Sequence, residues 1–292
     1  MNDKKLAVKR ILLFVLFSYG LYWIFAGLCD LFGILQDEAG FQFVTFIAMF
    51  TPAIGSLLTR LVTKEGMANS MLRLNLKGNG KYFLLAIAFP IIYTAIEDVL
   101  NAIILGAKFD PNAVFEAVGV SAAGYTAAIF FNIAISIALF PVFLGEELGW
   151  RGYLFPKLKT VMNRPAAYIV CGIIWGVWHT PAIIDGLNFG KDYMGYPYMG
   201  VLLMCLFCTG TGIIFAWLTE KTNSVYPAAF AHAVNNNATG LILALSETND
   251  ESRVLQFFLV GTAAIFIVAA ACIAESAVSE KRTAVSQKQA AD

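Results

Sequence analysis

The chain has 292 residues, of which 59% are hydrophobic and 14% are charged, and its formal net charge is zero. Soluble domains usually contain roughly 45–50% apolar and about 25% charged residues, so the composition excludes an ordinary soluble protein and indicates a membrane protein. The sequence has no long block of like charge, which argues against a nucleic-acid partner.

Eight long apolar runs occupy most of the chain. Each is close to or above the ~20 residues that a helix needs to cross about 30 Å of hydrocarbon. Because backbone polar groups in lipid must be hydrogen-bonded within the protein, these runs predict helices. The runs are Ile11–Leu35, Phe41–Val62, Tyr82–Leu105, Val118–Leu144, Ala166–Ile184, Tyr198–Leu218, Val225–Leu245 and Val254–Ala274. The sequence therefore predicts an all-α fold, a polytopic membrane helix bundle of about eight transmembrane helices.

The basic residues predict the orientation of this bundle. With the N-terminus inside, every Lys and Arg except Lys108, Lys191 and Arg253 falls on the cytoplasmic side, as the positive-inside rule requires. Both termini are then cytoplasmic, and the first apolar run, longer than that of a signal peptide, is an uncleaved span. Since the loops are short, we expect residues 1–292 to form a single membrane-embedded domain. The polar segment 275–292 is predicted to be a disordered tail.

The five cysteines all lie in apolar runs. Cys205 and Cys208 form a CxxC pair, a pattern that in other contexts marks a redox or metal site. In an apolar membrane segment, we expect packing or lipid-facing thiols instead.

A Gly-Glu-Glu-Leu-Gly-Trp-Arg-Gly stretch, Gly145–Gly152, follows the fourth apolar run directly. Two adjacent carboxylates at the edge of hydrocarbon are costly, so ionisable groups there indicate function. Arg151 lies four residues after Glu147, one helical turn later on the same face, where the two charges can pair. Glu146 is then free to point in another direction. The alternative is a helix that simply ends in interfacial charges.

Both histidines of the chain lie inside apolar runs, His179 in the fifth and His232 in the seventh. Two intramembrane histidines in a chain with an intramembrane diglutamate favour a shared polar site. Asn236 lies four residues after His232, on the same helical face. Its neighbours Asn235 and Asn237 are expected to face elsewhere and to make ordinary interhelical hydrogen bonds.

These side chains could hydrolyse an amide bond in two ways. Glu146 could take a proton from a water held by His179, while His232 and Asn236 donate hydrogen bonds to the oxyanion. Alternatively, Glu146, His179 and His232 could ligate zinc, and Glu147 or another group would act as base. Spacing alone leaves both open, whereas a serine hydrolase is disfavoured because no Gly-x-Ser-x-Gly elbow is present.

Three motifs in this order resemble those of the CPBP family of intramembrane proteases, which comprises CAAX proteases and bacteriocin-processing enzymes and is also called Abi. The motifs are Glu146-Glu147-x-x-x-Arg151, Trp175-x-x-x-His179 and His232-x-x-x-Asn236. Trp175 stands where the family usually has Phe, a change that keeps an aromatic wall. The core module would cover about residues 119–245.

The resemblance implies an intramembrane endopeptidase that opens to the cytosol. Glu146 would be the catalytic glutamate, and Glu147 with Arg151 would orient it. His179, His232 and Asn236 would complete the site as argued above. In eukaryotic members the substrate is a prenylated CAAX tail, and some bacterial members are linked to bacteriocin maturation or self-immunity. The expected partners are therefore membrane lipid and a peptide or protein substrate, lipidated or bacteriocin-like, in a bacterial plasma membrane. No cofactor is required except, in the metal alternative, zinc.

Two other classes of function remain open. A non-proteolytic bacteriocin-immunity factor or membrane scaffold could use the same polar cluster for recognition. A proton-linked transporter is the third possibility, because Glu97 and Asp98 lie in the third apolar run. We place these two carboxylates toward the outer end of their helix, away from Glu146, where interhelical or interfacial anchoring is the expected role.

Overall fold

The computed structural model describes residues 3–246 and 251–289, and every named element in these ranges is helical. The α-helices are α1 (Asp3–Leu31), α2 (Glu38–Ala48), α3 (Thr51–Val62), α4 (Gly80–Leu100), α5 (Pro111–Val118), α6 (Ala122–Ala138), α7 (Phe140–Gly149), α8 (Phe155–Val161), α9 (Arg164–Trp178), α10 (Thr180–Ile184), α11 (Tyr198–Thr222), α12 (Tyr226–Asn237), α13 (Thr239–Leu243) and α14 (Val254–Gln289). Short 3₁₀ turns form η1 (Ile34–Gln36) and η4 (Glu251–Arg253), and π-helical turns form η2 (Asn101–Leu105) and η3 (Trp150–Leu154). The predicted all-α membrane bundle is confirmed.

Within the described residues, five helices are long and apolar enough to cross a membrane. They are Asp3–Leu31, Glu38–Val62, Gly80–Leu105, Tyr198–Thr222 and Val254–Lys281. A sixth is added if α5 and α6, which meet at 86°, are counted as one broken span. The chain is therefore a multi-pass integral membrane protein. The count of eight and the cytoplasmic termini stay predictions.

Four of the eight apolar runs are divided into shorter helices, including the second, where α2 ends at Ala48 and α3 begins at Thr51. In the fourth run, α6 ends at Ala138 and α7 begins just before Pro141, whose ring nitrogen cannot continue the hydrogen-bond ladder. Pro181 acts in the same way in the fifth run, so α9 ends at Trp178 and α10 follows. In the seventh run α12 gives way to α13 at Ala238. Helix ends therefore lie inside the bundle rather than only at its surface.

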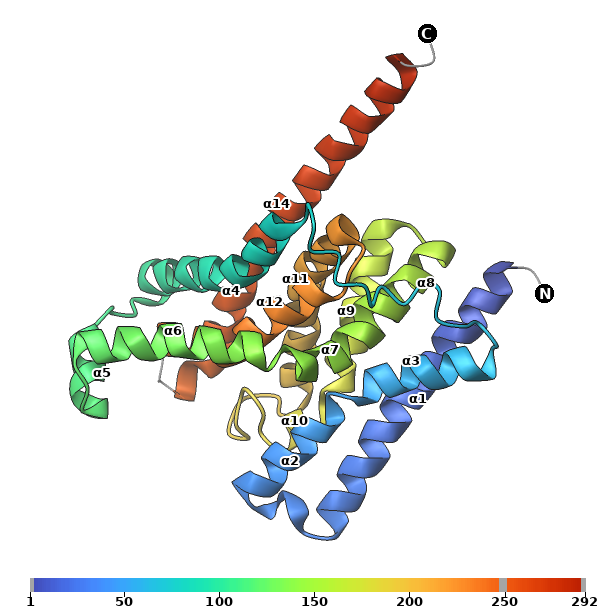
Figure 1. The fold of residues 1–292 in the computed structure, drawn as a ribbon. Helices are drawn as coiled ribbons and strands as arrows, with labels where there is room; N and C mark the ends of the chain where they lie inside the picture. Colours follow the sequence, from blue (N-terminus) through green and yellow to red (C-terminus); the bar gives the residue numbers. More distant parts are fainter. Residues whose placement is uncertain (1–2, 247–250, 290–292) are drawn as a thin grey trace.

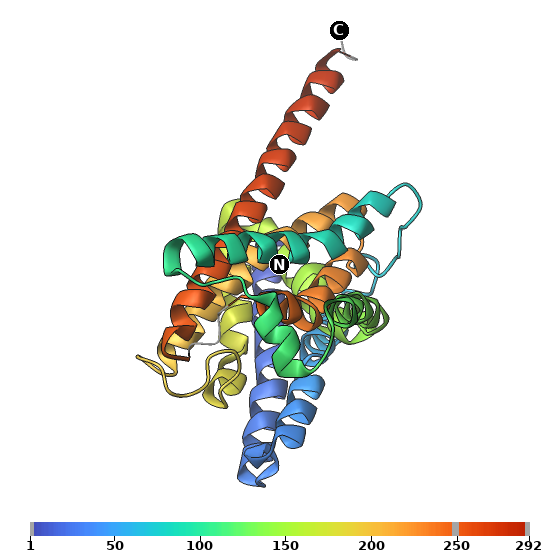
Figure 2. The same ribbon diagram turned by 90° about the vertical axis from the view of Figure 1, so that its left-hand side faces the viewer.

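Helix α11 lies in the middle of the bundle, where it packs against α9, α14, α12 and α4 (Figure 1). Of its most apolar stretch 72% is buried, against 22% for α1, which lies at the edge of the bundle. On the far side of α11 from α1, α14 packs against both α11 and α4, and α12 lies between α4 and α7. The C-terminal half of α14 extends beyond the other helices in both views (Figure 2). The broken helices α7, α9 and α12 thus occupy the interior between longer ones.

Close helix contacts at two glycines bring these inner helices together. A Cβ atom on Gly149 would lie 2.4 Å from Cβ of Pro52, which seats α7 on α3. A Cβ atom on Gly176 would lie 2.4 Å from the Cα of Cys205, so α9 and α11 touch backbone to backbone. Small residues at such contacts are typical of membrane helix packing, where dispersion contacts replace the hydrophobic effect.

The C-terminal segment differs from its sequence-based prediction as a disordered tail. Helix α14 continues to Gln289, well beyond Ala274. Residues of good helix propensity such as Ala, Glu, Lys and Gln dominate the segment and can extend a helix already anchored by its apolar half. One anchor is Arg164, whose Nη1 lies 2.6 Å from Oε1 of Glu280. Residues 290–292 lie outside the described ranges.

A charged cluster centred on Glu65 ties the loop after α3 to α1, η3 and α8. Its carboxylate accepts hydrogen bonds from Lys157 and from Tyr153 at 3.0 Å, and Arg10 lies at 3.2 Å. Burial by itself raises the pKa of Glu65, but Lys157, Tyr153 and Arg10 outweigh that effect. The pKa of Glu65 therefore lies below its usual value of 4.5.

We expect Gly176→Ala to lower the thermal unfolding temperature in detergent, because the added methyl group meets the backbone of α11. Overpacking of this kind costs about 1–3 kcal/mol. Gly20→Ala in α1 is the matched control, since nothing lies within 4 Å of its added Cβ and alanine favours the helix. Equal unfolding temperatures for the two variants would contradict the close packing of α9 on α11.

The Glu65 cluster predicts a pH-dependent contribution to stability. Because the folded pKa is depressed, the stabilisation is present above the unfolded value near 4.5 and disappears as pH falls through the lower folded value. Glu65→Gln should therefore unfold at a lower temperature than the wild type near neutral pH, and the gap should close below pH 4.5. The control is the exposed Glu38→Gln, which should show no gap at any pH. A gap for Glu65→Gln that persists unchanged into acid would refute the assignment.

Candidate functional site

The two adjacent glutamates on α7 each find a partner one turn later on η3. Trp150 donates its indole N–H to Oε2 of Glu146 at 3.0 Å, and Nη1 of Arg151 lies 2.9 Å from Oε1 of Glu147. Neighbouring residues of a helix point about 100° apart, so the carboxylates diverge and pair separately. All four side chains are almost fully buried, and the turn that carries Trp150 and Arg151 is a π-helix, a form that is frequent at functional sites.

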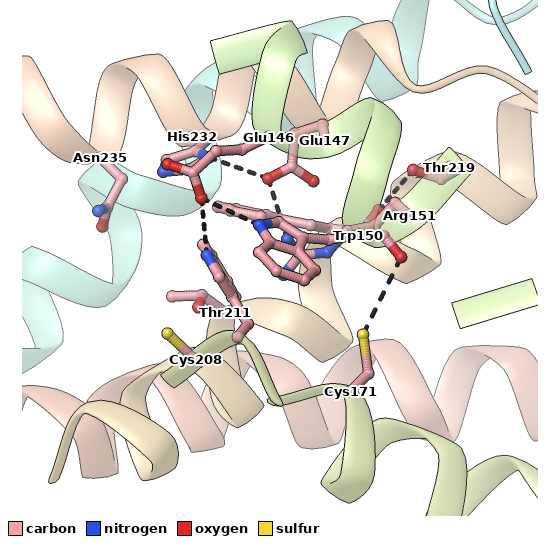
Figure 3. A network of polar contacts seen from close by, with 12 residues as sticks. Glu146, Glu147, Trp150, Arg151, Cys171, Cys208, Thr211, Thr219, His232 and Asn235 are labelled. Carbon is pink, nitrogen blue, oxygen red and sulfur yellow. Dashed lines mark hydrogen bonds and ion pairs between the residues drawn. The ribbon is translucent and has the colours of Figure 1, made fainter. Parts of the chain in front are cut away.

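Trp175 on α9 connects the two halves of this cluster. Its indole N–H is a second donor to Oε2 of Glu146, at 2.7 Å. The Cζ atom of Arg151 lies 4.0 Å from the centroid of the Trp175 ring, a cation–π contact that covers the buried guanidinium. Figure 3 shows Glu146, Glu147, Trp150 and Arg151 close together with their hydrogen bonds. With both indoles on Oε2, the other oxygen of Glu146, Oε1, accepts no hydrogen bond from the described residues.

Both histidines have their Nδ1 atoms held, which fixes the nitrogen that each can offer. Nδ1 of His179 lies 2.9 Å from the carbonyl oxygen of Trp175, and Nδ1 of His232 lies 2.9 Å from Oε1 of Glu147. Both partners are acceptors, so Nδ1 carries a proton in each ring and Nε2 is the atom left for other chemistry. His179 stands at the junction of α9 and α10, which exists because Pro181 interrupts the run.

A cavity with a volume of about 420 Å³ brings the predicted residues together. Glu146, His179, His232 and Asn236 all line it. Glu147 and Arg151 do not line it and lie behind His232 and Trp175. No lysine or arginine of the described chain is among the lining residues. The volume is within the range typical of ligand sites, about 300–1,000 Å³.

Two sequence-based interpretations at the edge of this cavity were wrong. Asn235 does not face elsewhere: it lines the cavity, and its Nδ2 donates to Oδ1 of Asn236 at 2.8 Å. Glu97 lines the same cavity as Glu146, although the sequence suggested that the two lie apart. The helix count along α4 gave only the depth of Glu97, whereas the packing of α4 against α12 and α14 decided what it faces.

The metal alternative requires ligands that surround one point. Zinc needs donors at about 2.0–2.2 Å from the ion, so three of them must lie close together. No group of three or more His, Cys, Asp or Glu side chains within residues 3–246 and 251–289 meets this requirement. Glu146, His179 and His232 share the cavity, but the donor set does not fit a three-ligand zinc site.

The sequence did not identify the two indole donors to Glu146. Trp150 was given no role, and Trp175 was expected only to supply an aromatic wall. A signal was present, because a tryptophan in an apolar segment needs a partner for its N–H. Trp150 lies four residues after Glu146, the same spacing that identified Arg151 as the partner of Glu147.

Comparisons with known proteins match this region. Residues 126–238 match the model of the family described as type II CAAX prenyl endopeptidase Rce1-like. A CAAX prenyl protease 2 from Methanococcus maripaludis is 30% identical over 129 residues, which cover 44% of this chain and 44% of the relative. The matched region thus spans less than half the length of that relative. It contains α7, η3, α9 and α12, the elements that carry the cavity-lining glutamate, histidines and asparagine. Residues 126–238 of this chain are therefore similar to the Rce1-like domain of type II CAAX prenyl endopeptidases.

Proposed function

We propose that the chain is an intramembrane endopeptidase in which Glu146 activates a water molecule for attack on a peptide carbonyl. The observation that carries the proposal is the arrangement of Glu146 with His179 in one cavity. Oε1 of Glu146 takes no hydrogen bond from the described residues, and because Nδ1 of His179 faces a carbonyl oxygen, Nε2 is the ring nitrogen that can accept a hydrogen bond. A water can donate one proton to each of these acceptors and keep a lone pair for the carbonyl carbon.

His232 and Asn236, which also line the cavity, would stabilise the negative charge that develops during the reaction. As the water oxygen bonds to the carbonyl carbon, its proton passes to Glu146 and negative charge develops on the carbonyl oxygen. His232, whose ring is held through Nδ1 by Glu147, would donate to this oxygen from Nε2, and Asn236 would donate from Nδ2. The C–N bond then breaks as Glu146 returns its proton to the leaving amine.

Glu147 and Arg151 support this site without contacting a substrate. Their ion pair is fully buried, and it fixes the His232 ring through Nδ1. Removing one partner of such a pair leaves a buried uncompensated charge, which typically costs about 3–5 kcal/mol. We therefore assign to this pair an orienting role, with a strong effect on folding.

The names of the similar proteins suggest which substrate class to test first. The name of the Methanococcus relative and the matched family both refer to CAAX prenyl tails, so a prenylated CAAX peptide is the first substrate to test. A set of unmodified peptides of mixed sequence tests the broader proposal of peptide processing, bacteriocin precursors included.

Glu146→Gln should abolish cleavage of such a peptide by the purified protein, with a loss of about 10²–10⁴-fold in kcat. The glutamine carbonyl can still accept both indole N–H groups, so we expect the unfolding temperature to be nearly unchanged. Glu38→Gln on the exposed face of α2 is the control and should cleave normally. Full activity of Glu146→Gln would reject the proposed role of Glu146, whereas no cleavage by the wild type would favour a scaffold or immunity factor.

Removal of metal provides an independent test of the water-activation step. Because the donor set does not fit zinc, we expect the cleavage rate to be unchanged after dialysis against a strong chelator such as EDTA. Addition of zinc afterwards should not increase the rate. A rate that falls with chelator and returns with zinc would overturn the proposed role of Glu146 as the group that activates water by itself.

A further inference from the structure

We propose that Tyr93 and Asn235 are positioning residues that set the orientation of the Asn236 side-chain amide. This inference rests on the proposed function, in which Asn236 donates to the oxyanion. One hydrogen bond links Tyr93 to Asn235, and a second links Asn235 to Asn236. The Tyr93 hydroxyl donates to Oδ1 of Asn235 at 2.5 Å, and Nδ2 of Asn235 donates to Oδ1 of Asn236 at 2.8 Å.

The direction of this chain of hydrogen bonds determines what Asn236 presents to the cavity. With its Oδ1 engaged by Asn235, Asn236 has both N–H groups of Nδ2 available as donors. If its amide were flipped, Nδ2 of Asn236 would face Nδ2 of Asn235, donor against donor. An amide oxygen would then point toward the developing oxyanion and repel it.

Tyr93 selects one of the two possible orientations of the Asn235 and Asn236 amides. If both amides were reversed together, they could still bond to each other, so the asparagines alone do not fix the orientation. Tyr93 is 2% exposed, and its hydroxyl has no other hydrogen-bond partner in the described chain. The reversed arrangement would leave this buried O–H without an acceptor, which is costly. The phenol on α4 therefore selects the donor-presenting state of Asn236 on α12.

The geometry also explains why the cavity is built from α4 as well as from the matched region. Tyr93 lies outside residues 126–238, yet α4 packs along α12 and presents Tyr93 to Asn235. Figure 3 shows Asn235 extending from α12 beside His232, the other proposed oxyanion donor. Both proposed donors are thus held by a neighbour, His232 by Glu147 and Asn236 by Asn235.

The test compares Tyr93→Phe with Tyr125→Phe in the full-length protein, with a fluorogenic prenylated CAAX peptide or the best cleaved unmodified peptide as probe. Tyr125 is also buried and donates to the carbonyl oxygen of Leu241 at 2.9 Å. Tyr125→Phe therefore loses one similar hydrogen bond that does not involve Asn235 or Asn236. We expect Tyr93→Phe to lower kcat roughly tenfold and to change KM by less than about twofold, because the oxyanion forms only after binding. Tyr125→Phe should stay within about twofold of the wild type in both.

A double-mutant cycle separates positioning from a general effect on structure. Asn236→Ala should lower kcat by about 10²–10³-fold, and adding Tyr93→Phe should cause no further loss. Asn237→Ala, on the same helix but bonded only to the carbonyl of Ala233, should cleave normally. The inference is overturned if Tyr93→Phe matches Tyr125→Phe, or if it lowers kcat equally with and without Asn236. Cleavage that survives Glu146→Gln, or no cleavage by the wild type, would instead overturn the proposed function, and this inference with it.

Discussion

The structure depends on how two adjacent carboxylates are accommodated in an apolar helix bundle. Glu146 and Glu147 are both almost fully buried, a state that is unfavourable unless each charge finds partners. Glu147 meets the guanidinium of Arg151 and the ring of His232, whereas Glu146 accepts hydrogen bonds, among the described residues, only from two indole N–H groups. This difference separates the roles of the pair. Glu147 is committed to an ion pair, and Glu146 retains an oxygen that can act on a ligand.

Trp175 contacts three of the polar residues of the site at once. One side chain donates to Glu146 and covers Arg151, and the backbone carbonyl of the same residue holds His179. A phenylalanine at this position, usual in the family that the sequence resembles, would keep the aromatic face but remove the donor. The departure therefore adds a hydrogen bond to the carboxylate that we propose as the base, and Trp150 supplies a second one from the same helix as Glu146.

The depth of the site follows from helices that end inside the bundle. Pro141 and Pro181 interrupt the fourth and fifth apolar runs, and the seventh run breaks after α12. At such ends the side chains turn into the interior instead of following one long helical face, and His179 occupies one of these junctions. The longer helices α4, α11 and α14 then enclose the cavity, and α4 and α14 contribute residues from outside the matched region, Tyr93 and Glu97 among them. The surrounding bundle thus completes the walls of the cavity and also fixes the orientation of its polar groups.

The sequence by itself determined the all-α membrane class and identified Glu146, His179, His232 and Asn236, because apolar length and spacing of four residues are local properties of a helix. It also identified the pairing of Glu147 with Arg151, which lie one turn apart on the same helix. Only the tertiary structure decided that Trp175 and Trp150 hold Glu146, and that Asn235 and Glu97 belong to the cavity wall. These features depend on the rotation of one helix against another and on where the helices break. The spacing of residues within one helix predicts neither the rotation nor the breaks. Both depend on contacts between residues far apart in sequence, such as Tyr93 and Asn235.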